Sequence, residues 1–311
     1  MRLRVTVAAD GFLDPASTPA IAHDLTFVPH GDLPAIRASL AGADALVTRR
    51  VDVTTGLLRG APRLRLVQQV GIGTDRIDLA GARAAGVPVA NTPGAVSVAV
   101  IEHTFLLVLA RLRALADQVA CIRRGGWSGP EVWEGDEIAG CTVGILGYGS
   151  IGRGLATRAL AFDARVLVAT RTPIADPLPG IECVDLPALL RRSDVLVVAA
   201  SLTPQTRGLI GRAELALMKP SALLVNVARG AIIDEAALVE ALDGGHLSGA
   251  ALDAFTIEPL PAGAALRNHP RVLATPHTAG SSRQSRDRIW AQMRANLDRL
   301  ARDEPLANVV N

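Results

Sequence analysis

The sequence CTVGILGYGSIG, at residues 141–152, decides the fold of this chain. Residues 142–146 form an apolar run with the length of a buried strand, and the run ends abruptly at the glycine-rich turn GYGSIG, residues 147–152. Residues 153–160 follow as a segment that is compatible with a helix. We therefore predict a strand, a tight glycine turn and a helix, in that order.

The three glycines of this turn have the spacing of a dinucleotide-binding motif. Gly147 would permit the tight turn, Gly149 the approach of a pyrophosphate to the backbone, and Gly152 the close packing of helix on strand. The amide groups of Ser150 and Ile151, at the positive end of the helix dipole, would hold the phosphate charge. Glycine turns occur in many loops, but here the flanking strand and helix supply the context that the motif requires.

The composition indicates a soluble globular protein of about two domains, with 311 residues, a net charge of +2 and 49% hydrophobic residues. Arginines are scattered among acidic residues, so the charge pattern does not indicate a nucleic-acid surface. Three widely spaced cysteines without a CxxC pair indicate neither a disulfide framework nor a metal site. Lys219 is the only lysine, which excludes Schiff-base chemistry at any other position.

We expect a cytoplasmic protein without a membrane segment. The first residues, MRLRVTVAADGF, begin directly with a strand-like alternation and lack the apolar core of a signal peptide. The longest apolar run, residues 95–110, is interrupted by Glu102 and His103 and is too short to span a bilayer.

Strand and helix patterns alternate in two blocks, which predicts an α/β fold with two Rossmann-like domains, each a doubly wound parallel sheet. The second block has near-continuous apolar strands, as a sheet covered on both faces requires. In the first block we expect strands at 3–9, 45–48, 64–70 and 87–90 and helices at 33–40 and 79–85. In the second we expect strands at 142–146, 165–170, 195–200, 222–228, 249–254 and 272–275, with helices at 152–161, 186–192, 213–218 and 235–242.

Two long helical patterns flank the second block. The pattern at 96–124 follows the break NTPG and is longer than a compact domain needs, which suggests packing on another subunit. The amphipathic pattern at 281–302 could return to the first block and make it discontinuous. We therefore expect a flavodoxin-like substrate domain at 1–92 and 281–311, and a dinucleotide-binding domain at 93–280.

Four polar residues follow predicted strands of the second block: Arg229, Asp253, Glu258 and His277. Each alone has an ordinary explanation, such as a solvated arginine, a helix-capping aspartate or a histidine that orders a turn. Because the carboxyl ends of parallel strands share one edge of the sheet, where ligands of such folds bind, the four together indicate a reactive site.

These residue types suit the reduction of a 2-oxo acid by hydride. The planar guanidinium of Arg229 would bind a carboxylate in bidentate fashion and polarise the neighbouring carbonyl. His277 would supply the proton to the developing alkoxide, and Glu258 beside it would favour the imidazolium that holds this proton. The hydride would come from a nicotinamide cofactor.

The chain resembles the D-isomer-specific 2-hydroxyacid dehydrogenases over nearly its whole length. The motifs that carry the resemblance are VGIGTDRIDL, NTPG, GYGSIG, SLTPQTRGLI, VNVARGAIIDEAAL, ALDAFTIEPLP and TPHTAG. The resemblance implies that Arg229, Glu258 and His277 are the catalytic set and that Asp253 contacts the nicotinamide side.

The same resemblance implies further contacts and an assembly. The backbone amides of Ile72 and Gly73, in a glycine loop, would bind the substrate carboxylate together with Arg229. Thr203, in SLTPQTRGLI, is expected to contact the cofactor. The long helix after NTPG would build a homodimer.

The cofactor prediction depends on residues 170–172. A fold of this kind that selects NAD usually has Asp or Glu after its second strand, to bind the ribose hydroxyls. Here Thr170, Arg171 and Thr172 stand there, and a guanidinium flanked by two hydroxyls would bind a ribose phosphate. We therefore predict that NADP(H) is preferred, with NAD(H) possible; Asp176, beyond Pro173, is the residue that would oppose this.

The substrate is less determined. The segments AASLTPQTRGLI and EPLP and the arginine after the second strand resemble the glyoxylate/hydroxypyruvate reductase branch, which reduces small 2-oxo acids to D-2-hydroxy acids. A 3-phosphoglycerate or bulkier D-2-hydroxyacid dehydrogenase is one alternative. A nicotinamide-sensing binding or corepressor protein that kept the fold is another.

Overall fold

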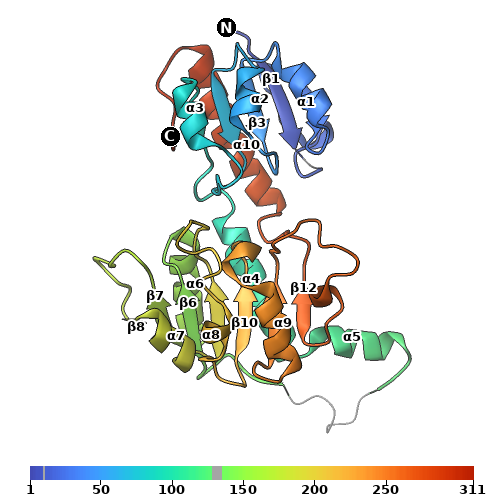
Figure 1. Cartoon of the computed structure of the whole chain (residues 1–311), viewed down its shortest axis with the longest axis vertical. Helices are drawn as coiled ribbons and strands as arrows, with labels where there is room; N and C mark the ends of the chain where they lie inside the picture. Colours follow the sequence, from blue (N-terminus) through green and yellow to red (C-terminus); the bar gives the residue numbers. More distant parts are fainter. Residues whose placement is uncertain (10, 128–134) are drawn as a thin grey trace. The chain divides into compact units, whose positions relative to one another are not determined.

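A computed structural model describes residues 1–9, 11–127 and 135–311 of the chain (Figure 1). They form two compact units, one from Met1–Val96 with Ser281–Asn311, the other from Ser97–Gly280. Each unit holds one parallel sheet with helices, so the predicted α/β class is confirmed.

The first unit contains a five-stranded sheet in the order β2-β1-β3-β4-β5, with every pair parallel. The last helix of the chain, α10 (Arg283–Ala301), buries Ile289, Trp290, Met293 and Leu297 against residues of the sheet. The strands are β1 (Arg4–Ala9), β2 (Asp24–Pro29), β3 (Ala45–Thr48), β4 (Leu66–Gln69) and β5 (Val89–Ala90). The helices are α1 (Leu33–Leu40), α2 (Thr55–Arg59) and α3 (Leu79–Ala84), and Pro15–Ser17 forms a 3₁₀ turn.

The second unit contains a seven-stranded parallel sheet in the order β12-β11-β10-β9-β6-β7-β8. From β6 the sheet is first extended on one side by β7 and β8, and then on the other side by β9 to β12. The strand order therefore reverses between β6 and β9, which is where sheets of this kind bind ligands. The strands are β6 (Thr142–Leu146), β7 (Arg165–Ala169), β8 (Ile181–Cys183), β9 (Val195–Val198), β10 (Leu223–Asn226), β11 (Gly249–Leu252) and β12 (Val272–Ala274).

The helices of the second unit are α4 (Ser97–Leu112), α5 (Leu115–Arg123), α6 (Ser150–Ala161), α7 (Leu186–Arg192), α8 (Arg212–Leu215) and α9 (Glu235–Asp243), with 3₁₀ turns at Gly230–Ile232 and Ala265–Arg267. The central strands β6, β9, β10 and β11 are buried along their whole length, which explains their continuous apolar sequences.

The prediction of one helix over 96–124 is wrong, because two helices, α4 and α5, occupy that segment. Ala114 between them has a φ of 47°, in the left-handed region that a right-handed helix cannot continue through. The sequence prediction also missed β2 and β8, each of which lies at one edge of its sheet.

Among the described residues, none of the helices combines the length and apolar character that crossing a bilayer would demand. Nor do His, Cys, Asp and Glu side chains gather in threes around a point that could hold a metal ion, again within the described ranges.

Candidate active site

The glycine turn after β6 has the geometry that the sequence predicts. Gly147 has a φ of 100°, and a Cβ there would lie 2.8 Å from the Ala200 backbone. A Cβ on Gly152 would lie 2.1 Å from the Gly147 carbonyl oxygen, so helix α6 packs closely on the turn. A Cβ on Gly149 would meet nothing within 4 Å, so this glycine faces open space. The two outer glycines thus build the turn, and the middle one leaves room for a ligand at the start of α6.

A cavity of about 980 Å³ opens beside this turn. The residues along the end of β7, at 170–172, form a second wall, and the segment after β9 forms a third. Of the predicted cofactor residues, the cavity brings together Gly147, Gly149, Ser150, Thr170, Arg171, Thr172 and Thr203. Ile151, Gly152 and Asp253 are not among the residues that line it.

Two arginines line the same cavity, Arg153 and Arg171. Both are exposed, and neither guanidinium has a hydrogen-bond or ion-pair partner within the described ranges. Arg153 was not predicted from the sequence, although it lies three residues after Ser150, on the same side of α6, and helical spacing could have found it. Asp176 and Asp185 also line the cavity and supply negative charge. Glycine backbone, hydroxyls and two guanidinium groups form a donor set that fits the phosphate groups of a dinucleotide.

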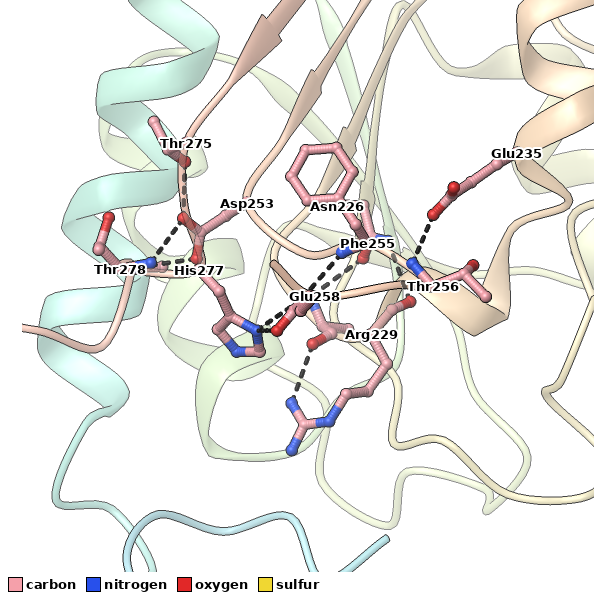
Figure 2. A network of polar contacts seen from close by, with 12 residues as sticks. Asn226, Arg229, Glu235, Asp253, Phe255, Thr256, Glu258, Thr275, His277 and Thr278 are labelled. Atoms are coloured by element: carbon pink, nitrogen blue, oxygen red, sulfur yellow. Dashed lines mark hydrogen bonds and ion pairs between the residues drawn. The ribbon is translucent and has the colours of Figure 1, made fainter. Parts of the chain in front are cut away.

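The catalytic residues predicted from the sequence meet at the other end of the same sheet edge. His277 follows β12, and its Nδ1 lies 2.8 and 2.7 Å from the two carboxylate oxygens of Glu258 (Figure 2). The backbone N–H of Phe255 donates to Glu258 Oε1 at 3.0 Å, which fixes the carboxylate. The side chains of His277 and Glu258 are 29% and 16% exposed, so the pair is sheltered but can still be reached.

Arg229 lies beside this pair, after β10 (Figure 2). The Asn226 side chain shapes the turn, because its Nδ2 donates to the Arg229 carbonyl at 3.0 Å and its Oδ1 accepts from the Ala228 N–H. Arg229 Nη1 donates to the Ala228 carbonyl at 2.9 Å. The next residue, Gly230, would place a Cβ 2.0 Å from the Phe255 carbonyl carbon. A glycine is therefore required where the Arg229 turn packs on the segment that leads to Glu258.

Asp253 is 1% exposed and is bonded to the loop that carries His277. Its Oδ1 accepts from the Thr275 hydroxyl at 2.6 Å and from the Thr278 N–H at 2.9 Å, and its Oδ2 accepts from the Ala279 N–H at 2.8 Å (Figure 2). The predicted nicotinamide contact of Asp253 stays a prediction. The bonds of the carboxylate give it a second task, the anchoring of the loop at 275–279.

His103, on α4, joins this network without having been predicted to do so. Its Nε2 lies 3.1 Å from Thr275 Oγ1 and 3.6 Å from Asp253 Oδ1. The sequence gives no local signal for this contact, because 172 positions separate His103 from Thr275.

Ile72 and Gly73 lie in the first unit, directly after β4 and Gly71. The turn is held by Gly71, whose N–H donates to Thr92 Oγ1 at 2.8 Å, and by the Ile72 carbonyl, which accepts from Asn91 Nδ2 at 3.0 Å. Within the described residues, neither the Ile72 nor the Gly73 N–H is used in a backbone hydrogen bond. Their role in binding a carboxylate remains a prediction.

Comparisons with known proteins identify the family of this chain. The family model "D-isomer specific 2-hydroxyacid dehydrogenase, NAD binding domain" matches residues 105–279. A glyoxylate reductase of Aeropyrum pernix is 41% identical over 279 residues, 86% of this chain and 83% of that protein. A D-3-phosphoglycerate dehydrogenase of Methanocaldococcus jannaschii is 36% identical over 86% of this chain and 52% of its own length. The crystal structure of the TT0316 protein from Thermus thermophilus has a TM-score of 0.91 at 34% identity and covers 99% of this chain and 100% of that one. The chain therefore belongs to the D-isomer specific 2-hydroxyacid dehydrogenase family and is an NAD(P)-dependent oxidoreductase.

Proposed function

We propose that this protein reduces a small 2-oxo acid, such as glyoxylate or hydroxypyruvate, to the D-2-hydroxy acid with NADPH. The observation that carries the proposal is the contact of His277 Nδ1 with both oxygens of Glu258, beside Arg229 and at the carboxyl edge of a dinucleotide-binding sheet. An acid, its carboxylate partner and a fixed cation are the groups that carbonyl reduction needs.

Each of the three side chains has one task in this reaction. Glu258 accepts a hydrogen bond from Nδ1 of His277, which orients the ring and leaves Nε2 to exchange a proton with the substrate oxygen. Arg229 binds the substrate carboxylate and polarises the carbonyl. A bound nicotinamide supplies the hydride to the carbonyl carbon. The oxygen then takes its proton from His277, and in the reverse direction the same imidazole accepts it.

The preference for NADPH is supported by the charges in the cofactor cavity. Arg171 is flanked by the Thr170 and Thr172 hydroxyls, and Arg153 adds a second guanidinium that the sequence prediction lacked. A phosphate on the adenosine ribose could pair with Arg171, with Arg153 or with both, whereas two bare ribose hydroxyls would offer neither guanidinium a bond to a negative charge.

The test is a spectrophotometric panel of 2-oxo acids, each with NADPH and with NADH. We expect the highest kcat/KM for glyoxylate or hydroxypyruvate with NADPH. Higher kcat/KM with NADH would contradict the cofactor proposal and leave the reaction class intact. Negligible turnover of every 2-oxo acid, with cofactor binding retained, would instead favour a nicotinamide-sensing binding protein.

A second candidate, oxidation of 3-phosphoglycerate, is favoured by the 36% identity with the phosphoglycerate dehydrogenase of Methanocaldococcus jannaschii. Phosphohydroxypyruvate and 3-phosphoglycerate therefore belong in the panel. A kcat/KM for phosphohydroxypyruvate above that for glyoxylate and hydroxypyruvate would select this candidate.

We also propose that the protein is a homodimer built on α4 and α5. Helix α5 has no buried residue, and Leu115 and Ile122 on it are 45% and 56% exposed, as is Leu106 on α4 at 55%. Apolar side chains gathered on neighbouring helices are typical of an interface. Light scattering should give twice the chain mass, and Leu106→Glu with Ile122→Glu should give a folded monomer. A monomeric wild-type protein would contradict the proposal.

A further inference from the structure

The loop that carries His277 holds this residue in an unfavourable backbone conformation. His277 has a φ of 54°, in the left-handed region, where a side chain with a Cβ approaches the backbone too closely. The bonds to Asp253 lie on both sides of it, from Thr275 before and from Thr278 and Ala279 after. Asp253 therefore stabilises the conformation that points the His277 ring toward Glu258.

The polarity of the hydrogen bonds identifies His103 as a donor to this anchor. The Thr275 hydroxyl has one proton, which it donates to Asp253 Oδ1 at 2.6 Å. Thr275 Oγ1 is then only an acceptor toward His103, whose Nε2 lies 3.1 Å away. His103 must consequently carry a proton on Nε2, and the three groups form a chain in which every proton points toward the carboxylate.

The hydrogen bonds that run from His103 through Thr275 to Asp253 are largely shielded from solvent. The side chain of His103 is 17% exposed and that of Asp253 is 1% exposed, so water competes little for these bonds. His103 stands on α4, which contacts β11, the strand that leads to Asp253. The donor His103 therefore lies on a helix, and the acceptor Asp253 directly follows a strand.

We propose that His103 is a positioning residue for the proton donor His277. Through Thr275 it fixes Asp253, and through Asp253 it fixes the backbone of the loop at 275–279. This proposal rests on the proposed function, in which His277 gives its proton to a substrate oxygen. It assigns His103 no contact with substrate or cofactor.

A positioning role affects the chemical step and leaves binding almost unchanged. The His103→Leu variant should lower kcat about tenfold, because a small displacement of a catalytic group is costly, with KM values for the 2-oxo acid and for NADPH within about twofold of wild type. The His103→Gln variant should recover most of kcat, because its amide can donate to Thr275 in the same direction.

The experiment measures kcat, both KM values and the thermal midpoint Tm for His103→Leu, His103→Gln, Thr275→Val and the double variant His103→Leu with Thr275→Val. Because His103 acts through Thr275, the double variant should lose no more than the Thr275→Val variant alone. His269→Leu is the matched control, since His269 Nε2 also contacts a carboxylate, Asp243 Oδ1 at 3.2 Å, but outside the site. It should keep wild-type kcat.

Several outcomes would overturn the proposal. They are a wild-type kcat in His103→Leu, losses that multiply in the double variant, or a His103→Gln variant as slow as His103→Leu. The proposal would also be overturned if kcat fell in proportion to Tm in every variant, because the loss would then reflect reduced stability and not positioning. Turnover that survives His277→Ala would contradict the proposed function itself, whereas turnover that is lost in His277→Ala and kept in His103→Leu would contradict this inference alone.

Discussion

At the carboxyl edge of the seven-stranded sheet, the polar side chains beyond β11 and β12 (the paired end) and those beyond β6 and β7 (the unpaired end) differ in whether they already have partners. Beyond β11 and β12, the carboxylates of Asp253 and Glu258 already accept hydrogen bonds from other side chains and from backbone N–H groups. Beyond β6 and β7, the guanidinium groups of Arg153 and Arg171 line a cavity without a partner among residues 1–9, 11–127 and 135–311. The groups proposed to orient the reaction are thus already paired within the fold, whereas the groups proposed to bind a ligand charge remain available to that ligand.

Physical chemistry accounts for this difference. A buried carboxylate without donors is costly, so Asp253 and Glu258 have to be satisfied within the fold. An exposed guanidinium stays hydrated at little cost and gains a charge-assisted bidentate bond only when a phosphate arrives. We therefore predict that substitutions beside Asp253 and Glu258, at the paired end, change the rate of the chemical step. Substitutions of Arg153 or Arg171, at the unpaired end, should instead change which cofactor is selected.

The largest expected effect tests the paired end. Replacement of His277 by alanine removes the group that we propose protonates the substrate oxygen, and general acids contribute up to about 10⁴-fold, so we expect kcat to fall roughly 1,000-fold. NADPH affinity, measured by nucleotide fluorescence, should stay within about twofold. Near-normal turnover of His277→Ala would show that the Glu258 contact has another purpose.

The second effect tests the unpaired end. In Arg171→Asp a carboxylate would repel the ribose phosphate and could accept hydrogen bonds from ribose hydroxyls. We expect kcat/KM with NADPH to fall about 100-fold, the loss of a charged hydrogen bond plus the new repulsion, and the preference to reverse toward NADH. Equal losses with both cofactors would mean that Arg171 supports the cavity wall and does not read the phosphate.

The local parts of both ends could be predicted from the sequence, and the long-range parts could not. Gly147 and Gly152 can be recognised in the sequence, because a turn with no space for a Cβ requires glycine at these particular positions. The contact of His103 with Thr275 joins two segments that only the packing of α4 on the sheet brings together. The break at Ala114 was missed for a related reason, since the apolar spacing continues across it and no glycine or proline marks it.

A smaller effect separates the two arginines. Arg153 lines the cavity from helix α6 and Arg171 from the turn after β7, so the phosphate could pair with either or both. In Arg153→Gln we expect KM for NADPH to rise about tenfold, with KM for NADH almost unchanged. Arg158→Gln, one turn further along α6 and outside the cavity lining, is the control and should change neither value. A rise in KM for both cofactors would instead place Arg153 at the pyrophosphate that they share.

The smallest effect concerns a paired carboxylate away from either end, that of Asp194, which directly precedes β9. Asp194 accepts from the Lys219 ammonium at 2.7 Å and from the Thr142 N–H at 2.8 Å. Partial burial alone would raise the pKa of this carboxyl, but the bonds from Lys219 and Thr142 outweigh it and hold the pKa below its ordinary value of 3.8. Because the pKa of Asp194 is depressed in the folded state, its ionised carboxylate stabilises the fold at pH values above the ordinary pKa. This stabilisation is lost as the pH falls through the folded-state pKa.

Lys219→Met should therefore lower the free energy of unfolding by only about 0.5 kcal/mol at pH 7, because the two side chains of the ion pair are 37% and 30% exposed. Urea unfolding across a pH series should show this difference shrinking below about pH 4, as Asp194 becomes protonated in both states. The kcat at pH 7 should equal that of wild type. A pH-independent loss of stability would mean that the Lys219 side chain stabilises the fold by apolar packing, and a fall in kcat would mean that pairing outside the carboxyl edge also positions the reaction.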